Sequence, residues 1–353
     1  MRTQCLASIE WPDAVNYLFR CWFPVAWTKD LPKRKPLAFT VLGQQYVAFR
    51  SVSQVTVLED RCPHRGVRLS CGRILDGSLE CPYHGWTFGT NGECIYIPSE
   101  HENETVTRRK ARVQSFPVRE IGEMIWFCPS RDPVGEPIPW QFPDQRGFLT
   151  VEDFDCSYLK ILANLVDNPH AGVLHRWLLR SKPKNEVTAV VTDSSSTVLI
   201  KTYGETSQGS ILYRVFGNRN MTLDHSEEFV APTVVRTLFA HSKLGSAASS
   251  QFVCTPIDEH RTRIHYRNTL QVPGLGSALG PLFISVVRKI IRQDKYILEE
   301  EERCSANSSP KQQPISTMAD TPSLHVISHA KFFAAQGPRL DHPTKEITIK
   351  YWL

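Results

Sequence analysis

The chain has 353 residues, and its 41 Lys and Arg exceed its 36 Asp and Glu to give a net charge of +5. That length suggests about two domains, and 41% hydrophobic with 22% charged residues excludes a disordered, collagen-like or coiled-coil chain. The charge is mild and spread along the chain, which argues against a nucleic-acid binder. The start lacks the features of a secretory signal. We therefore expect a soluble cytoplasmic protein whose ten cysteines do not form a disulfide framework.

The first half of the chain is predicted to be an all-β domain at residues 36–135, preceded by a leading segment at 1–35. Its short stretches alternate apolar and polar residues, as half-buried strands do. The stretch TFGTNGECIYI predicts a hairpin that turns at Asn91 and Gly92. The Pro-rich stretch 131–145 cannot continue a regular helix or a central strand, so it marks the domain boundary.

Residues 146–353 combine strands with two helical segments, at 158–180 and 281–303, which predicts an α+β domain with an antiparallel sheet. The polar, Pro-punctuated stretch 305–323 is predicted to be a mobile loop. The most apolar stretch, 272–287, contains two prolines and is too short to span a bilayer. The expected strands of this domain include STVLIKTYG, SILYRVFG and TRIHYRNTLQV.

Two cysteines and two histidines are spaced as Cys-x-His and Cys-x-x-His in RCPHRG and CPYHGW: Cys62, His64, Cys81 and His84. A Cys₂His₂ set can bind a structural zinc. It can also hold a [2Fe–2S] cluster with two Cys on one iron and two His on the other. Each pair lies in a predicted loop, where glycines and prolines let backbone N–H groups turn toward sulfur. This context favours the cluster over zinc, and over four unrelated loop residues.

The apolar stretch 159–180 contains polar side chains that need partners when buried: Asn164, Asp167, His170 and His175. Two histidines five residues apart do not share a face of a straight helix. Pro169 and Gly172, however, can break the helix and bring both imidazoles to one point. The combination indicates metal ligation, whereas a lone histidine would indicate a hydrogen-bonded core residue.

Two histidines do not by themselves complete a metal site, and a carboxylate is a common third protein ligand, as in the 2-His-1-carboxylate site. In the predicted helix 284–303 the apolar stripe passes through Asp294. A carboxylate in a core-facing row is costly unless it is paired or bound to metal, so Asp294 is the predicted third ligand. The alternative is partial burial of Asp294 against Arg288 or Lys295.

These motifs resemble the Rieske non-heme iron oxygenase family, and the resemblance runs over nearly the whole chain from FRCWFPVAW onward. It implies a Rieske domain followed by a helix-grip catalytic domain. It also implies that Asp167 links the two metal centres and that Asn164 lies beside the iron. Gln293 is a departure, because the family often has Glu before the third ligand. The implied ligands are Cys62, His64, Cys81 and His84 for the [2Fe–2S] cluster, and His170, His175 and Asp294 for Fe(II).

The resemblance implies a terminal oxygenase, in which electrons pass from the cluster to the mononuclear iron and O₂ is the co-substrate. The single-chain layout and the NLVDNPH segment are similar to the vanillate demethylase, caffeine demethylase and saxitoxin-tailoring type. This favours monooxygenation or demethylation of a small ring compound over dioxygenation. The Rieske half also resembles the pheophorbide oxygenase branch, whose C-terminal Cys-x-x-Cys is absent here. The sequence does not name the substrate-binding residues.

We find neither a GxGxxG nor a flavin motif, so a separate reductase or ferredoxin is expected to supply electrons and NAD(P)H acts only indirectly. Arg65 and Arg68 flank the first cluster loop and are candidate docking residues for an acidic donor. The alternative for these arginines is an ordinary solvated surface.

The family implies a ring of subunits, usually a homotrimer, in which Asp167 bridges His84 to the neighbour's iron ligand. Asp167 could instead only cap or bend its helix. Two rival functions remain open: a Rieske electron-transfer protein with an appended domain, and a hydrophobic-ligand carrier without a second metal.

Overall fold

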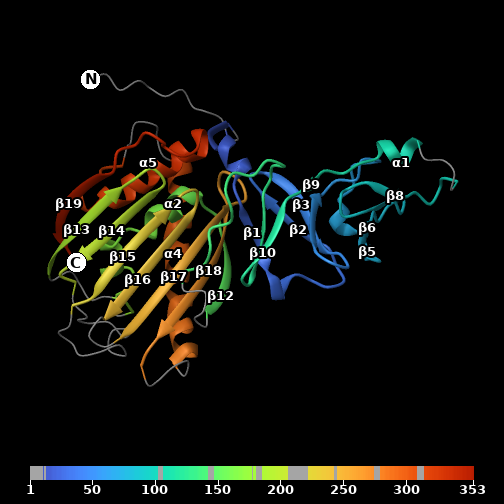
Figure 1. Ribbon diagram of the computed structural model, residues 1–353. Helices are drawn as coiled ribbons and strands as arrows, with labels where there is room; N and C mark the ends of the chain where they lie inside the picture. The colour runs from blue at the N-terminus through green and yellow to red at the C-terminus, as the bar shows by residue number, and fades with distance from the viewer. Residues whose placement is uncertain are drawn as a thin grey trace. The chain divides into compact units, whose positions relative to one another are not determined.

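The computed structural model describes two compact units within residues 11, 13–101, 106–141, 147–176, 178–179, 185–205, 222–241, 245–273, 279–307 and 314–353 (Figure 1). One unit comprises Phe19–Pro139, and the other joins Met1–Leu18 to Trp140–Leu353. The units therefore divide inside the Pro-rich stretch at 131–145.

The Phe19–Pro139 unit is almost entirely β-structure, built as three small sheets. The described strands within them pair antiparallel, as suits short connections. The first sheet has the order β1-β11-β10, with β1 Phe23–Trp27, β10 Val118–Ile121 and β11 Met124–Phe127. The second has the order β2-β3-β4-β9, with β2 Leu37–Val41, β3 Gln44–Arg50, β4 Val55–Glu59 and β9 Ser115–Phe116.

The third sheet of this unit has the order β5-β6-β7-β8, and the loop of Cys81 and His84 connects β6 to β7, whereas the loop of Cys62 and His64 precedes β5. Its strands are β5 Arg73–Leu75, β6 Ser78–Glu80, β7 Thr87–Phe88 and β8 Cys94–Tyr96. The predicted hairpin at Asn91 and Gly92 is confirmed, since β7 and β8 pair antiparallel around it. Gly92 has a φ of +78°, and a Cβ there would lie 1.9 Å from the Val113 carbonyl oxygen, so only glycine fits.

The larger unit is built on one antiparallel sheet of eight strands, in the order β12-β18-β17-β16-β15-β14-β13-β19. Buried residues alternate with mostly half-buried ones along β13 and β15, because one face of the sheet is covered. The predicted α+β class is confirmed. The strands are β12 Gly147–Phe154, β13 Glu186–Asp193, β14 Thr197–Tyr203, β15 Asp224–Val230, β16 Val234–His241, β17 Ser246–Pro256, β18 Thr262–Gln271 and β19 Lys345–Trp352.

Three helices cover one face of this sheet: α2 Tyr158–Asn164, α4 Gly280–Asn307 and α5 Thr321–Gln336 (Figure 1). The predicted bend is confirmed, since α2 ends at Asn164 and a short 3-10 turn follows at Pro169–Gly172. The buried residues of α4 include Val287, Ile291, Asp294 and Leu298, which is the stripe expected from the sequence. None of the described helices is long and apolar enough to cross a membrane.

The prediction of a loop over 305–323 is wrong at both ends. Helix α4 continues to Asn307, and α5 begins at Thr321 after the 3-10 turn Met318–Asp320. Thr317 and Asp320 form a capping box, and Pro322 occupies the first turn of α5, so start signals for this helix were present in the sequence. The expected strand SILYRVFG lies outside the described residues. The remaining short elements are α1 Val106–Lys110 and the 3-10 turns Asp13–Arg20, Thr28–Asp30 and Leu69–Cys71.

Candidate metal centres

The two cysteine–histidine loops share one backbone design. The Gly66 N–H donates to the Cys62 carbonyl at 2.8 Å, and the Gly85 N–H donates to the Cys81 carbonyl at 3.2 Å. Both glycines have a positive φ, +74° and +69°, which a side chain would strain. Each loop therefore turns back on itself immediately after its cysteine.

The four side chains of these loops lie together with the sulfurs on the inside. Cys62 and Cys81 are buried in the unit's core, whereas His84 is exposed. The rings of His64 and His84 are 4.5 Å apart between centroids, and Trp86 stacks on His64 at the same distance with an interplanar angle of 5°. Burial raises the pKa of the Cys62 thiol to about 11, and the contact with Cys81 also raises it. Binding a metal group here would therefore release protons.

The spacing of these four side chains bears on the choice between a zinc ion and a [2Fe–2S] cluster. A tetrahedral zinc holds its ligand atoms about 3.4–3.8 Å apart. Among the described residues, only one group brings three ligand atoms within 4.8 Å of one another, and it does not include these four side chains. Among the described residues these four side chains therefore do not form a compact single-ion group, and the ligand set is the one that a [2Fe–2S] cluster with two Cys and two His takes.

That one compact group consists of His170, His175 and Asp294. His175 Nε2 lies 2.9 Å from Asp294 Oδ1 and 3.2 Å from His170 Nε2, and His170 Nε2 lies 3.5 Å from Asp294 Oδ1. Ligand bonds of about 2.1 Å place neighbouring ligand atoms about 3.0 Å apart at right angles and about 3.4 Å apart at tetrahedral angles. The three atoms are therefore spaced as the ligands of one ion would be.

The local fold explains this convergence. His170 lies in the Pro169–Gly172 turn and His175 lies just beyond it. The break after α2 therefore brings the Nε2 atoms of both rings toward one point. Asp294 enters from α4, where it is 6% exposed. Among the described residues its ion pairs are with His170 and His175, not with Arg288 or Lys295.

The second ring nitrogen of each histidine is also held. His170 Nδ1 lies 3.2 Å from Asp167 Oδ2, and His175 Nδ1 lies 3.0 Å from Gln293 Oε1. A carboxylate or amide oxygen accepts from Nδ1–H, which fixes the tautomer and leaves Nε2 free for a metal. The contact of Gln293 was not foreseen from the sequence, although its position next to Asp294 was the available signal.

The three side chains line a cavity of about 150 Å³ between the helices and the sheet of the larger unit. A dry cavity of that size holds a benzene ring. Its walls are mostly apolar, and Asn164 and Asp167 lie at the same wall as the histidines. The sequence prediction missed further polar wall residues, among them Glu227 and His241. The available signal was the alternation along β15 and β16, which places these charged and polar residues on the inward-facing side of each strand.

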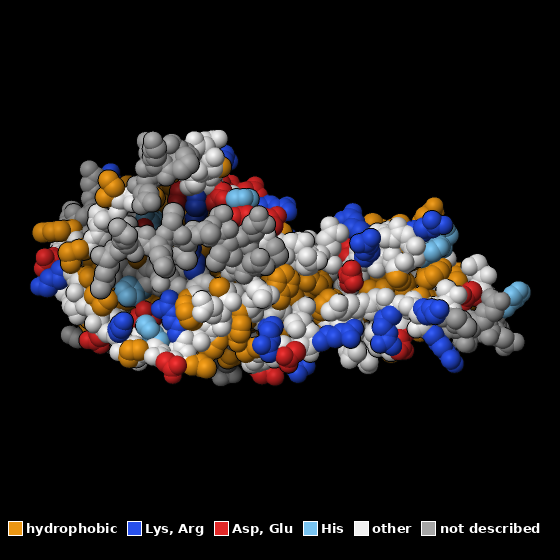
Figure 2. Space-filling model, turned by 90° about the horizontal axis from the view of Figure 1, so that it is seen from above, with side chains coloured by type: hydrophobic (Ala, Val, Ile, Leu, Met, Phe, Trp, Pro, Cys, Tyr) orange, Lys and Arg blue, Asp and Glu red, His pale blue; other side chains and the backbone are white. Residues whose placement is uncertain are grey.

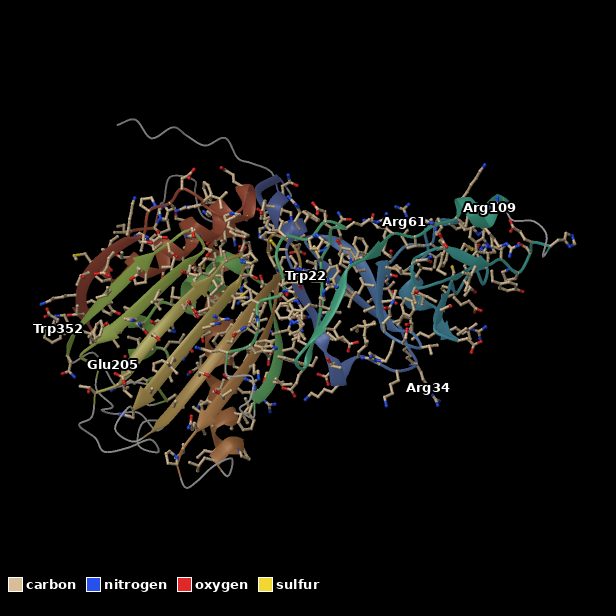
Figure 3. The ribbon with its side chains drawn as sticks, in the orientation of Figure 1. Trp22, Arg34, Arg61, Arg109, Glu205 and Trp352 are labelled. Carbon is tan, nitrogen blue, oxygen red and sulfur yellow. The ribbon has the colours of Figure 1, made fainter. Side chains whose placement is uncertain are left out.

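The arginines near the first cluster loop are exposed. Within the part of the chain that the structure describes, Arg61, Arg65 and Arg68 form no ion pair, whereas Arg73 pairs with Glu80 at 2.7 Å. Figure 2 shows several Lys and Arg side chains on the surface of this unit, and Figure 3 labels Arg61. The surface charge is thus available to a partner.

Comparison with known proteins supports this reading of both units. Residues 21–117 match the Rieske [2Fe-2S] domain, and residues 154–328 match the vanillate O-demethylase oxygenase C-terminal domain. The first match contains Cys62, His64, Cys81 and His84, and the second contains His170, His175 and Asp294. The chain belongs to the Rieske non-heme iron oxygenase family. Membership implies a [2Fe–2S] cluster, a mononuclear iron and O₂ as co-substrate.

Individual relatives are distant. The chain is 29% identical over 275 residues to the chloroplast protein TIC 55 of Arabidopsis thaliana, covering 74% of this chain and 48% of the relative. It is 29% identical over 231 residues to the oxygenase component of chloroacetanilide N-alkylformylase of Rhizorhabdus wittichii, covering 59% of this chain and 62% of the relative. The chain thus spans about half to two thirds of these relatives.

Among solved structures, the dicamba monooxygenase bound to dicamba superposes with a TM-score of 0.77. The sequence identity is 22%, and the match covers 90% of this chain and 97% of that one. At this identity the similarity establishes the shared fold, which agrees with the predicted arrangement of a Rieske domain and a catalytic domain.

Proposed function

We propose that the chain is a terminal oxygenase that hydroxylates or demethylates a small ring compound. One observation carries the proposal: His170, His175 and Asp294 converge on one point in the wall of an apolar cavity. A site that only transferred electrons would not need three ligands beside a cavity. The domain limits follow the sequence, with 36–135 as the Rieske domain and 146–353 as the catalytic domain.

The ligand roles are part of the proposal. Cys62, His64, Cys81 and His84 would hold the cluster, and His170, His175 and Asp294 would hold Fe(II). The cluster would supply single electrons, and the iron would activate O₂. The protein's own contribution is orientation: Asp167 and Gln293 fix the two imidazoles, and the three ligands on one side leave the cavity side open.

Monooxygenation or demethylation is favoured over dioxygenation by the kind of relatives found. Their names describe a dicamba monooxygenase and a chloroacetanilide N-alkylformylase. The small cavity also suits a compound with a single ring. The rival reading of a hydrophobic-ligand carrier shares the apolar cavity but gives no role to the converging ligands.

Electron supply and assembly complete the proposal. A separate reductase or ferredoxin would dock at Arg65 and Arg68, which are exposed and lack an ion pair among the described residues. In a homotrimer, the exposed His84 of one subunit would approach Asp167 of the next, and Asp167 already contacts His170. The expected cytoplasmic location stays a prediction, since relatives include a chloroplast protein.

The test combines metal analysis with oxygen consumption. We expect three irons per chain after anaerobic purification, two from the cluster and one mononuclear. The brown cluster should be lost in Cys62→Ala and Cys81→Ala. Reduced protein should consume O₂ in the presence of substrate. Two irons and no O₂ consumption would identify the electron-transfer rival, and ligand binding without O₂ consumption would identify the carrier.

A further inference from the structure

The sheet side of the cavity carries two hydroxyl side chains that the metal centre does not use. Thr237 on β16 and Ser250 on β17 both line the cavity and are half-buried. They are paired residues of neighbouring strands. Paired residues on one face of a sheet hold their Cβ atoms about 4.5–5.5 Å apart, so a single polar group can contact both hydroxyls.

The period of the strands explains why these two side chains face the cavity. Residues two apart on a strand face the same way. The cavity-lining residues of the two strands follow this spacing: Thr237, Phe239 and His241 on β16, and Ala248, Ser250 and Phe252 on β17. The metal ligands come from the helix side of the same cavity. A ligand that contacted both hydroxyls would therefore lie between the sheet and the metal centre.

The two hydroxyls differ in the hydrogen bonds that they can still form. Ser250 Oγ donates its proton to Asn268 Oδ1 at 2.6 Å, and Asn268 is the residue paired with Ser250 on β18. The remaining capacity of Ser250 Oγ is its lone pairs, which can only accept. The Thr237 hydroxyl has no partner among the described residues and is not one of their buried, unpaired polar atoms, so it is accessible. It can both donate and accept toward the cavity.

This combination of hydroxyls selects the polar group of a ligand. A group that itself donates and accepts, such as a hydroxyl or an amide, can satisfy both side chains at once. An ether or a carboxylate has no proton to give to Ser250 Oγ and leaves two acceptors facing each other. The cavity has the volume of a single ring and mostly apolar walls. Because unpaired polar groups are costly to bury, such walls favour a ligand that is otherwise apolar.

We propose that the cavity takes a small ring compound with one uncharged hydroxyl or amide group, which accepts from Thr237 Oγ1 and donates to Ser250 Oγ. The proposal names the substrate class of the proposed oxygenase and rests on that function. Thr237 and Ser250 are then the residues that determine specificity on the sheet side. Phe252 and Phe283 in the apolar walls hold the ring itself. With its polar group anchored at the sheet, the ligand presents its other carbons to the metal side.

Three probes of similar shape test the proposal. Benzyl alcohol donates and accepts, its isomer anisole only accepts, and ethylbenzene does neither. Binding is measured by calorimetry on the iron-loaded, oxidised protein without donor and without O₂. Within each variant, the dissociation constants of benzyl alcohol and anisole are divided by that of ethylbenzene. This ratio removes general changes of the cavity and isolates the hydrogen bonds.

Two variants separate the donor from the acceptor. Thr237→Val keeps the shape of the side chain and should weaken both benzyl alcohol and anisole relative to ethylbenzene by about 3- to 10-fold, the usual effect of losing one neutral hydrogen bond. Ser250→Ala should weaken benzyl alcohol by a similar factor and leave anisole unchanged. Thr237→Ser keeps the hydroxyl and should keep the wild-type ratios. Ser249→Ala is the matched control, because Ser249 lies on the same strand but faces the other side of the sheet, where it bonds to Thr269 at 2.7 Å.

Unchanged ratios in Thr237→Val, or no detectable binding of benzyl alcohol to the wild type, would each overturn the inference. If Thr237→Val fails to fold, Ser250→Ala against Ser249→Ala decides in the same way. Failure of the inference is distinguishable from failure of the proposed function, because binding requires no turnover. Protein that gives the expected ratios but never consumes O₂ contradicts the oxygenase function. Protein that consumes O₂ with ring compounds while the ratios stay unchanged contradicts the hydroxyl anchor and leaves the oxygenase function intact.

Discussion

Gln293 Oε1 lies 3.0 Å from His175 Nδ1, and the next residue, Asp294, lies 2.9 Å from the other nitrogen of the same ring. Two consecutive residues of α4 thus hold both nitrogens of one imidazole. The family often has Glu at the position of Gln293. A neutral amide accepts the same hydrogen bond without adding charge next to Asp294.

We predict that Gln293→Leu weakens iron binding by about 10- to 100-fold, the usual effect of losing a hydrogen bond to a metal ligand. The measurement is iron retention against a chelator, with the cluster spectrum as an internal reference. Gln293→Glu keeps the acceptor and should retain iron. Equal iron retention by the Leu variant and the wild type would show that this hydrogen bond does not hold the ring.

The mononuclear site should be separable from the cluster. His170→Ala, His175→Ala and Asp294→Ala should each lower iron from three to two per chain, because each removes one of three converging ligands. Iron analysis and the visible spectrum measure the two centres independently. Glu299→Ala is the control. Glu299 lies on the same helix as Asp294, but its carboxylate accepts a hydrogen bond from the Asp155 backbone N–H instead of approaching the histidines. Loss of iron in that variant, with full iron in Asp294→Ala, would assign the third ligand to Glu299.

The exposed arginines near the first cluster loop, Arg61, Arg65 and Arg68, should make reduction of the cluster by the donor sensitive to salt. Exposed charges are screened over about 10 Å at 0.1 M salt, so the rate of cluster reduction should fall as salt rises. Arg65→Gln and Arg68→Gln should lower the rate and flatten this dependence. Arg34→Gln is the control, since Arg34 is exposed in the same unit but lies outside the cluster loops, before β2. Stopped-flow reduction that ignores salt and both variants would place the dock elsewhere.

Asp167→Asn tests the proposed bridge between subunits. If Asp167 links His84 to the neighbour's His170, the variant should keep its metals and its fold but pass electrons slowly in a single turnover. If Asp167 only shapes the turn before Pro169, the variant should lose stability and iron while the remaining loaded protein turns over normally. Light scattering provides the assembly control, because a stable and active monomer contradicts the ring.

The ion pairs of His225 with Glu205 and Glu227 predict that the stability of the fold depends on pH. The pKa of His225 is raised in the folded state to about 9, above its ordinary value of 6.5. Its contribution is therefore complete below about pH 6.5 and is lost as the pH rises through about 9. The melting temperature of the wild type should fall more steeply from pH 7 to 9.5 than that of His225→Gln. Parallel curves would mean that His225 is not an imidazolium in the folded protein.

Sequence alone determined the parts of this protein that depend on short-range patterns. The loops of Cys62 and Cys81 are each closed by a glycine four residues later, so their geometry is local. The break that turns His170 and His175 together is likewise encoded by Pro169 and Gly172. Asp294 was predicted because a charged residue interrupts an apolar helical stripe, and its burial agrees with that reasoning.

Tertiary structure decided the contacts between residues distant in the chain. Asp294 is 119 residues from His175, so its approach depends on how α4 packs over the sheet. The partner of His175 Nδ1, 118 residues away, could not be read from composition or periodicity. Glu227 and His241 looked like ordinary strand residues until the register of β15 and β16 placed them in the cavity. A strand pattern indicates which residues face inward, but only the packed layers show what they face.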